Sequence, residues 1–174
     1  MRETPRQYSK RVVSYVGNRK PLAILRASER RLARLKRVPR KLIKRRPAPG
    51  KWSIGEIVAH LADVELVIGY RIRMMLSANR TPIQAIDQDK WAKSGGYGKR
   101  DVRRTIEAFG ALRKNNLALL QSMPKKKWSN YGLHAERGRE SIAHTVRLYA
   151  GHDLNHLKQI ENILKQFKRG SRAA

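Results

Sequence analysis

The chain has 174 residues, of which 40% are hydrophobic, and this length and composition suit one domain with a buried core. It contains no cysteine, which excludes disulfide bonds, thiolate metal sites and a cysteine nucleophile, and leaves histidine and carboxylate as metal ligands. No apolar run approaches the roughly 18 residues of a membrane-spanning helix, and the start, MRETPRQYSK, lacks the apolar segment of a signal peptide. We therefore expect a soluble, cytoplasmic protein without a membrane span.

Charge is the most unusual property of the chain. The 40 Lys and Arg residues against 13 Asp and Glu give a formal net charge of +27, which favours nucleic acid or another polyanion as a partner. The basic residues are nevertheless spread along the whole chain, as in RRLARLKRVPRKLIKRR at 30–46, and do not gather in one stripe. Two hypotheses follow: a surface shifted to positive charge by engineering, that is, a supercharged variant, or a natural protein that binds nucleic acid without sequence specificity.

The first half of the chain predicts two helices. Residues 1–20 contain a short apolar segment, which we interpret as an N-terminal strap across the domain. From residue 21 to about 38, leucines recur at helical spacing after a proline, which the first turn of a helix tolerates. Ser53 and Glu56 then form a capping-box pattern, so a second amphipathic helix is predicted from residue 54 to about 78.

The second half predicts a long connection and two more helices. Residues 80–100 show no periodicity, and a connection of this length permits a crossover, so that the helices it joins need not be antiparallel neighbours. Asp101 suits the cap of a third helix, which runs from 102 to about 123. The fourth helix spans 141–167, and residues 168–174 are expected to form a disordered basic tail. Four amphipathic helices without strands predict an all-α fold, a four-helix bundle at residues 21–167 with a crossover between helices two and three.

The fourth helix carries two histidines, His152 and His156, on or beside its apolar stripe. Residues four apart lie one turn above the other, so both side chains can reach the same point. A single buried histidine is most often a core residue bonded to a neighbour, but two of them beside an inward-facing Asp153 favour a metal site. Zinc normally takes three protein ligands in a catalytic site, and His60 on the second helix is the natural third ligand in such a bundle.

Other residues near these histidines allow two interpretations each. Glu65 falls near the centre of an apolar stripe, where an unpaired carboxylate is unfavourable. Glu65 and Asp153 can accept the outer N–H of a metal-bound histidine, and the alternative is a buried salt bridge to an arginine such as Arg71. We interpret Trp91 as an anchor of the long connection and His144 as an ordinary surface or packing residue.

Several motifs occur together in a characteristic order. They are KWSIGEIVAHLADVE at 51–65, DQDKWA at 87–92, GLHAERGRES at 132–141 and GHDLNHLKQI at 151–160. In order and spacing the chain resembles the DinB-like superfamily, which includes the YfiT type of metal-dependent hydrolase, and the resemblance covers roughly residues 20–167.

The resemblance implies a four-helix bundle that holds a divalent metal, zinc or nickel, through His60, His152 and His156. It places His134 near the mouth of the metal pocket, and a role in stabilising a turn is the alternative. It further implies hydrolysis or thiol S-transfer at a metal-bound water or thiol, with a small-molecule substrate such as a low-molecular-weight thiol, and it leaves a homodimer open. The competing hypothesis is a non-enzymatic basic bundle that binds nucleic acid or other polyanions.

Overall fold

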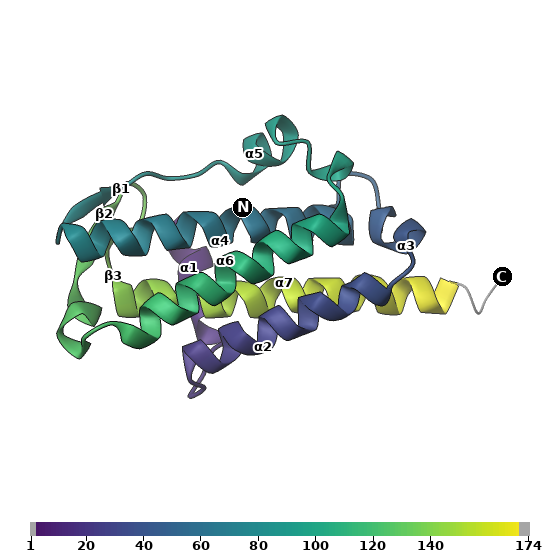
Figure 1. Ribbon diagram of the computed structural model, residues 1–174. Coiled ribbons are helices and arrows are strands. Elements are labelled where there is room, and N and C mark those ends of the chain that lie inside the picture. The colour runs from purple at the N-terminus through teal and green to yellow at the C-terminus, as the bar shows by residue number, and fades with distance from the viewer. Residues whose placement is uncertain (1–2, 171–174) are drawn as a thin grey trace.

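The computed structural model describes residues 3–170, and its body is a bundle of four long helices (Figure 1). Their bounds are Pro21–Ala33 for α2, Ile54–Ser77 for α4, Val102–Ser122 for α6 and Ile142–Gly170 for α7. The predicted four-helix bundle is therefore confirmed. None of the helices within residues 3–170 combines the length and the apolar character needed to cross a membrane.

Two predicted helix ends differ from the structure. The first predicted helix is shorter than expected, because after Ala33 the chain tightens into a 3-10 helix, η1, at Arg34–Arg37. The last helix is longer, so residues 168–170, which were expected in a disordered tail, are helical. The remaining residues of that expected tail, 171–174, lie outside the described residues.

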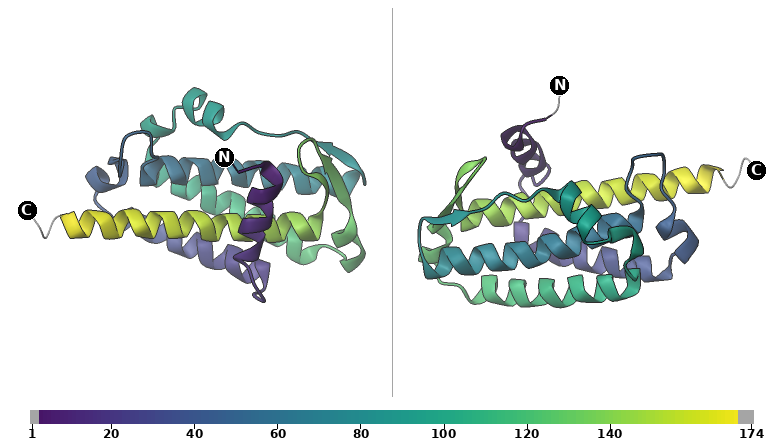
Figure 2. Two further views of the ribbon diagram at one scale, coloured as in Figure 1. Left: turned by 180° about the vertical axis from the view of Figure 1, so that it is seen from behind. Right: turned by 90° about the horizontal axis from the view of Figure 1, so that it is seen from above.

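Helices α4 and α6 lie side by side and run in the same direction, as do α2 and α7 (Figures 1 and 2). Consecutive helices can be parallel neighbours only when the connection between them returns along the bundle. The segment between α4 and α6 does so along the outside of α4, and it includes helix α5, Gln88–Ser94, and a 3-10 turn η2, Tyr97–Lys99. The predicted crossover is confirmed.

A small sheet closes one end of the bundle, at the left in Figure 1. Strand β1, Thr81–Ile83, pairs in parallel with β2, Tyr131–His134, and β2 pairs antiparallel with β3, Gly138–Ser141. The expectation of a fold without strands was wrong, because strands of three and four residues are too short to show alternation in the sequence. Their pairing brings the start of the long connection beside His134.

The predicted helix starts are confirmed in atomic detail. The Ser53 hydroxyl accepts the Glu56 N–H at 3.2 Å, and the Glu56 carboxylate accepts the Ser53 N–H at 2.8 Å, which completes the capping box of α4. The Asp101 carboxylate accepts the Arg104 N–H at 2.9 Å at the start of α6. These caps fix where each helix begins and hence which side chains face inward.

The apolar core has two parts with polar side chains between them. One part packs residues 68–75 of α4 against residues 142–150 of α7 near the sheet, and the other packs residues 54–62 of α4 against residues 157–167 of α7. Three buried polar residues of α7, at positions 152, 153 and 156, fall in the gap between these two stretches. These three polar side chains therefore lie at mid-bundle, with packed apolar residues on both sides.

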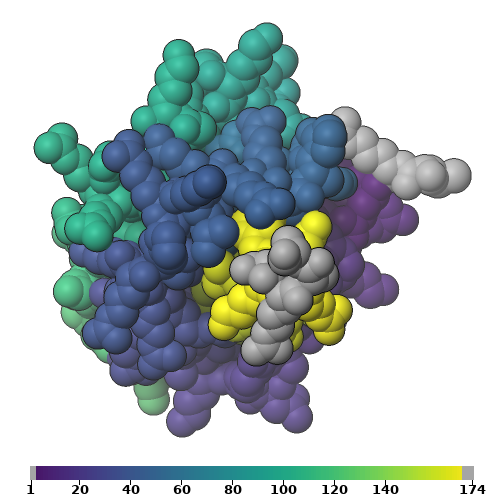
Figure 3. All heavy atoms as spheres, turned by 90° about the vertical axis from the view of Figure 1, so that its right-hand side faces the viewer, coloured from purple at the N-terminus to yellow at the C-terminus, as the bar shows by residue number. Residues whose placement is uncertain are grey.

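Short helices complete the fold. At the end opposite the sheet, α3, Arg40–Lys44, and the turn after it lie against the end of α7 (Figure 3). The Arg45 guanidinium lies over the Phe167 ring there, 4.7 Å from the ring centroid. A further 3-10 turn, η3, spans Lys125–Ser129. The N-terminal segment forms α1, Pro5–Ser14, which crosses α7 on the outside of the bundle (Figure 2).

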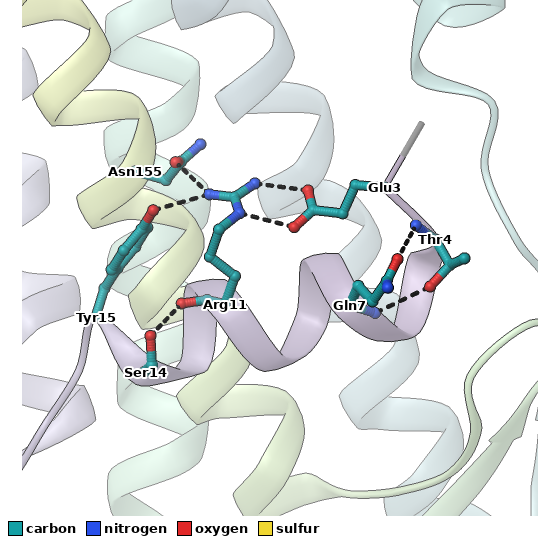
Figure 4. Close-up of polar contacts among 7 residues, drawn as sticks. All are labelled: Glu3, Thr4, Gln7, Arg11, Ser14, Tyr15 and Asn155. Atoms are coloured by element: carbon teal, nitrogen blue, oxygen red, sulfur yellow. Dashed lines mark hydrogen bonds and ion pairs between the residues drawn. The ribbon is translucent and has the colours of Figure 1, made fainter. Parts of the chain in front are cut away.

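Arg11 ties α1 to the bundle. Its guanidinium donates to the Glu3 carboxylate at 2.8 and 2.9 Å and to the Asn155 amide oxygen on α7 at 3.2 Å (Figure 4). Val12 and Val16 beneath it are fully buried. The segment interpreted as a strap thus packs directly over the part of α7 that carries the paired histidines.

Candidate metal centre

Three histidines from two helices converge inside the bundle. His60 comes from α4, and His152 and His156 come from successive turns of α7, as the four-residue spacing predicted. The Nε2 atoms of His60 and His152 are 3.1 Å apart, and the ring centroids of the three residues are 4.5–5.1 Å from one another. One ligand nitrogen from each lies within 4.8 Å of the other two.

Burial keeps these imidazoles uncharged. All three are at most 8% exposed. Burial, reinforced by the neighbouring His156, lowers the pKa of His60 to about 3. Burial also lowers the pKa of His152 and His156, although the hydrogen bond to Gln159 opposes the effect at His156. Neutral imidazole is the form that offers a nitrogen lone pair to a metal.

The surroundings orient each ring. Trp52 packs on His60 with a centroid separation of 5.1 Å. His156 Nδ1 lies 3.0 Å from the Gln159 side-chain oxygen, so Nδ1 carries the proton and Nε2 keeps its lone pair. His152 Nδ1 is buried and has no hydrogen-bond partner within residues 3–170. Three neutral, converging imidazoles are a donor set that suits a divalent transition metal, so the residues present fit such an ion.

A buried ion cluster lies beside the histidines. Arg113 of α6, 2% exposed, contacts the Glu65 carboxylate at 2.8 Å and the Asp153 carboxylate at 2.7 Å, and it donates to the Leu25 carbonyl at 2.8 Å. The Asn116 amide donates to Glu65 at 2.9 Å. Of the two interpretations given for Glu65 and Asp153, the structure therefore shows the buried salt bridge to an arginine.

Arg113, and not Arg71, is the arginine in that cluster. Burial opposes its charge, but the two carboxylates more than compensate and raise the pKa of Arg113 above its ordinary value. Because the cluster joins α4, α6 and α7, it fixes the relative positions of the helices that carry the histidines. Arg71 instead donates to the Tyr149 hydroxyl at 2.9 Å and to the Gln84 carbonyl at 2.6 Å.

A cleft of about 1100 Å³ leads to the histidines from outside. His60 and His152 line it, together with residues of α1, the long connection and the β2–β3 turn. Trp91 also lines it and is 39% exposed, so it is less buried than we expect of a residue that anchors a loop. Tyr97, which is 2% exposed and packs edge-on to Trp52, is the aromatic residue that anchors this connection.

His134 satisfies both interpretations made for it. It lines the cleft, and its Nδ1 accepts the Glu136 N–H at 3.1 Å in the turn after β2. Burial, reinforced by Arg137, lowers its pKa to about 4. His144 is apart from the other histidines and lies 4.0 Å from the Glu140 carboxylate, which agrees with an ordinary packing role.

The sequence analysis missed three contributors to this centre: Arg113, Trp52 and Gln159. Arg113 lies on the same face of α6 as Ile106, Phe109 and Leu120. A charged residue on an apolar stripe is the signal that identified Glu65, and the same signal could have identified Arg113. Gln159 is three residues after His156, a spacing at which helical side chains meet. Trp52 precedes the cap of α4, and nothing in the sequence indicated that it packs on His60.

Sequence comparisons relate the chain to one family of known proteins. The sequence model of the DinB superfamily matches residues 23–160. Two proteins of Oceanobacillus iheyensis, both named "putative metal-dependent hydrolase", are 25% identical over 117 residues and 26% identical over 112 residues. These matches cover 67% and 64%, respectively, of both chains. A Bacillus cereus protein with the same name is 25% identical over 117 residues, 67% of both chains.

Two solved structures share the fold. YfiT from Bacillus subtilis, described as "a probable metal-dependent hydrolase with an unusual four-helix bundle topology", superposes with a TM-score of 0.79 at 17% identity and covers 85% of this chain and 86% of that chain. A mycothiol-dependent maleylpyruvate isomerase has a TM-score of 0.61 at 13% identity, over 77% of this chain and 58% of its own. At these identities the likeness concerns the fold.

Proposed function

We propose that this chain, which belongs to the DinB superfamily, is a metal-dependent enzyme whose His60, His152 and His156 hold one divalent metal, zinc or nickel. The observation that carries the proposal is the convergence of three buried, neutral imidazoles from two helices at the end of a cleft. The names of the relatives in Oceanobacillus and Bacillus support it.

The residues of the chain prepare the site in three ways. Burial keeps the imidazoles deprotonated at neutral pH, Gln159 fixes the tautomer of His156, and Trp52 shields one side of His60. A divalent ion bound there supplies a Lewis acid that lowers the pKa of a bound water or thiol.

Glu65 and Asp153 act on the site through Arg113. The formal charges of Arg113, Glu65 and Asp153 add up to one negative charge next to three neutral ligands, which favours a divalent cation over an empty site. Asp153 also lies between His152 and His156 in the chain, so its contact with Arg113 fixes the rotation of α7 that points both histidines inward. We assign these residues a positioning role.

The cleft suits a small-molecule substrate. Hydrolysis is the reaction class that we favour, because the curated relatives are named as hydrolases. Transfer to or from a low-molecular-weight thiol is the alternative within the same site, and the name of the mycothiol-dependent structural neighbour supports it. In both cases the substrate enters between α1, α5 and the β2–β3 turn.

Elemental analysis after supplementation with zinc or nickel tests the proposal. We expect close to one metal per chain in the parent protein, and loss of most of it in His60→Ala and in His152→Ala, since two imidazoles make a poor site. His144→Ala is the matched control and should keep its metal. Zinc or nickel should also raise the melting temperature of the parent but not of His152→Ala, because a ligand that binds only the folded state stabilises it. A parent protein that stays metal-free would refute the proposal.

A further inference from the structure

The lining of the cleft includes a buried cation that has no counter-ion within residues 3–170. Arg71 lines the cleft and is 7% exposed. Its two terminal nitrogens donate to neutral oxygens, the Tyr149 hydroxyl and the Gln84 carbonyl. No carboxylate within residues 3–170 comes within ion-pair distance of it. Buried charges in proteins are normally paired, so this guanidinium is suited to an anionic ligand.

A second donor beside it also lacks an acceptor. Because His134 Nδ1 accepts the Glu136 N–H, its ring proton must be on Nε2, and burial keeps the imidazole neutral. His134 is 3% exposed, lines the cleft, and its Nε2 has no hydrogen-bond partner among the described residues. The turn therefore fixes the side chain as an N–H donor.

The sheet places these two donors close together. His134 pairs with Ile83 in the β1–β2 ladder, and the Ala135 N–H donates to the Ile83 carbonyl at 3.1 Å. Gln84, whose carbonyl accepts from Arg71, is the next residue. On the other side, the Tyr149 ring that carries the hydroxyl bound by Arg71 is 6.1 Å from the His152 ring. The donors are thus separated from the three-histidine group by about one tyrosine side chain.

The other charged groups around Arg71 are either paired with an opposite charge or exposed to solvent. The Arg137 guanidinium donates to both oxygens of the buried Glu140 carboxylate, at 2.6 and 2.9 Å. Asp63 accepts from Arg100 at 2.6 Å, and Glu136 is exposed at the rim of the cleft. Arg71 is therefore the buried charged residue of the cleft lining that has no ion-pair partner within residues 3–170.

We propose that Arg71 and the Nε2–H of His134 form a subsite for the carboxylate of a small organic substrate, with its reactive group directed past Tyr149 toward His60, His152 and His156. This inference rests on the proposed function, since it concerns the substrate of the same cleft. A carboxylate carries one negative charge and accepts hydrogen bonds in the plane of a guanidinium, which matches one arginine and one neutral donor. A phosphate dianion would leave a second negative charge without a partner in a buried position.

Binding of benzoate to the metal-free, isotopically labelled full-length protein tests the subsite, with benzamide as its neutral counterpart and inorganic phosphate as the competing anion. At about 0.15 M salt, which screens diffuse surface attraction, we expect benzoate to shift the NMR signals of His134 and Gln84 with saturation, and benzamide and phosphate to bind much more weakly. This comparison needs no variant. Phosphate binding as tightly as benzoate would overturn the assignment to a carboxylate.

Variants locate the site. Arg71→Gln should weaken benzoate binding by about tenfold or more, as expected for loss of a charge-assisted contact, and Arg71→Lys should recover part of it. Arg103→Gln, which removes the same charge from an exposed position of α6, should have no effect. Equal affinities of Arg71→Gln and Arg103→Gln, or benzoate shifts spread over the basic surface without saturation, would overturn the proposal.

Metal content is measured separately from benzoate binding, so a failure of the proposed metal site can be distinguished from a failure of the carboxylate subsite. A protein that takes up metal but not benzoate refutes the subsite and leaves the proposed function. A protein that binds benzoate at Arg71 but takes up no metal refutes the proposed function and leaves the subsite.

Discussion

Helix α1 crosses α7 so closely that the α7 residue at the crossing, Gly151, has no room for a side chain. A Cβ atom on Gly151 would lie 2.5 Å from the Val12 carbonyl carbon and closer still to its oxygen, both of them backbone atoms of α1. Ordinary carbon contacts are about 3.5–4.0 Å. A side chain can avoid such a contact by changing its rotamer, but backbone atoms cannot. Gly151→Ala must therefore push α1 away from α7.

Opposing effects set the size of the change. Alanine is favoured over glycine in a helix interior by about 1 kcal/mol. Displacement of α1 exposes Val12 and Val16, both fully buried, and each buried valine contributes roughly 1.5–3 kcal/mol. If both contacts are lost, the steric loss exceeds the gain in helix propensity, and Gly151→Ala should lower the free energy of unfolding by about 2–5 kcal/mol.

Urea unfolding followed by circular dichroism measures this directly, and Gly110→Ala on α6 is the matched control. A Cβ on Gly110 would meet its nearest atom, a side-chain oxygen of Glu29, at an ordinary 3.5 Å. We expect that control to be stabilised by up to about 1 kcal/mol. If Gly151→Ala is as stable as Gly110→Ala, α1 does not pack on α7 as described.

Three further predictions concern charge. Metal-free protein should lose stability as the pH falls from about 6.5 to 5, because the histidines take up protons in the unfolded chain, whereas His60 and His134 stay buried and neutral in the folded protein. At pH 5 the loss in free energy of unfolding is about 2 kcal/mol for each of these two histidines. Urea unfolding that is unchanged over this pH range would contradict the prediction. Arg113→Met should lower the free energy of unfolding by about 3–5 kcal/mol, because it leaves two buried carboxylates, Glu65 and Asp153, without their cation; urea unfolding measures the loss, and a variant as stable as the parent would contradict it. The melting temperature should rise between about 20 and 300 mM salt, since screening relieves the repulsion of a +27 chain, and a fall would contradict this explanation.

Long-period patterns in the sequence predicted most of the fold. The stripes of α4, α6 and α7 each extend over five or more turns, and local chemistry at Ser53 and Asp101 fixed where two of these helices start. The meeting of His152 and His156 followed from the same periodicity, because their four-residue spacing places both side chains on one face of α7. The prediction that His60 joins the two histidines of α7 needed the additional assumption that α4 faces α7, which a four-helix bundle justifies.

Contacts between segments distant in the chain could not be predicted in this way. The β1–β2 ladder joins residues about 50 positions apart through only three residue pairs, and its register depends on how the ends of the bundle meet. The close approach at Gly151 depends on the crossing point of α1, to which no periodicity refers. The pairing of Arg113 with Glu65 and Asp153 was hidden because one inward-facing arginine does not stand out among 40 basic residues.

The cleft differs in charge from the rest of the molecule. Four of the 40 basic residues line it, namely Arg71, Lys90, Lys93 and Arg137, against five of the 13 acidic residues, namely Glu3, Asp63, Asp87, Asp89 and Glu136. The positive excess therefore lies outside the cleft, where solvent and salt screen it. A polyanion attracted by the net charge would meet the outer surface, whereas a ligand in the cleft meets a nearly balanced set of charges and one buried guanidinium. Substitution of lysines on the outer surface should therefore weaken any binding of polyanions and leave the affinity of a ligand in the cleft unchanged.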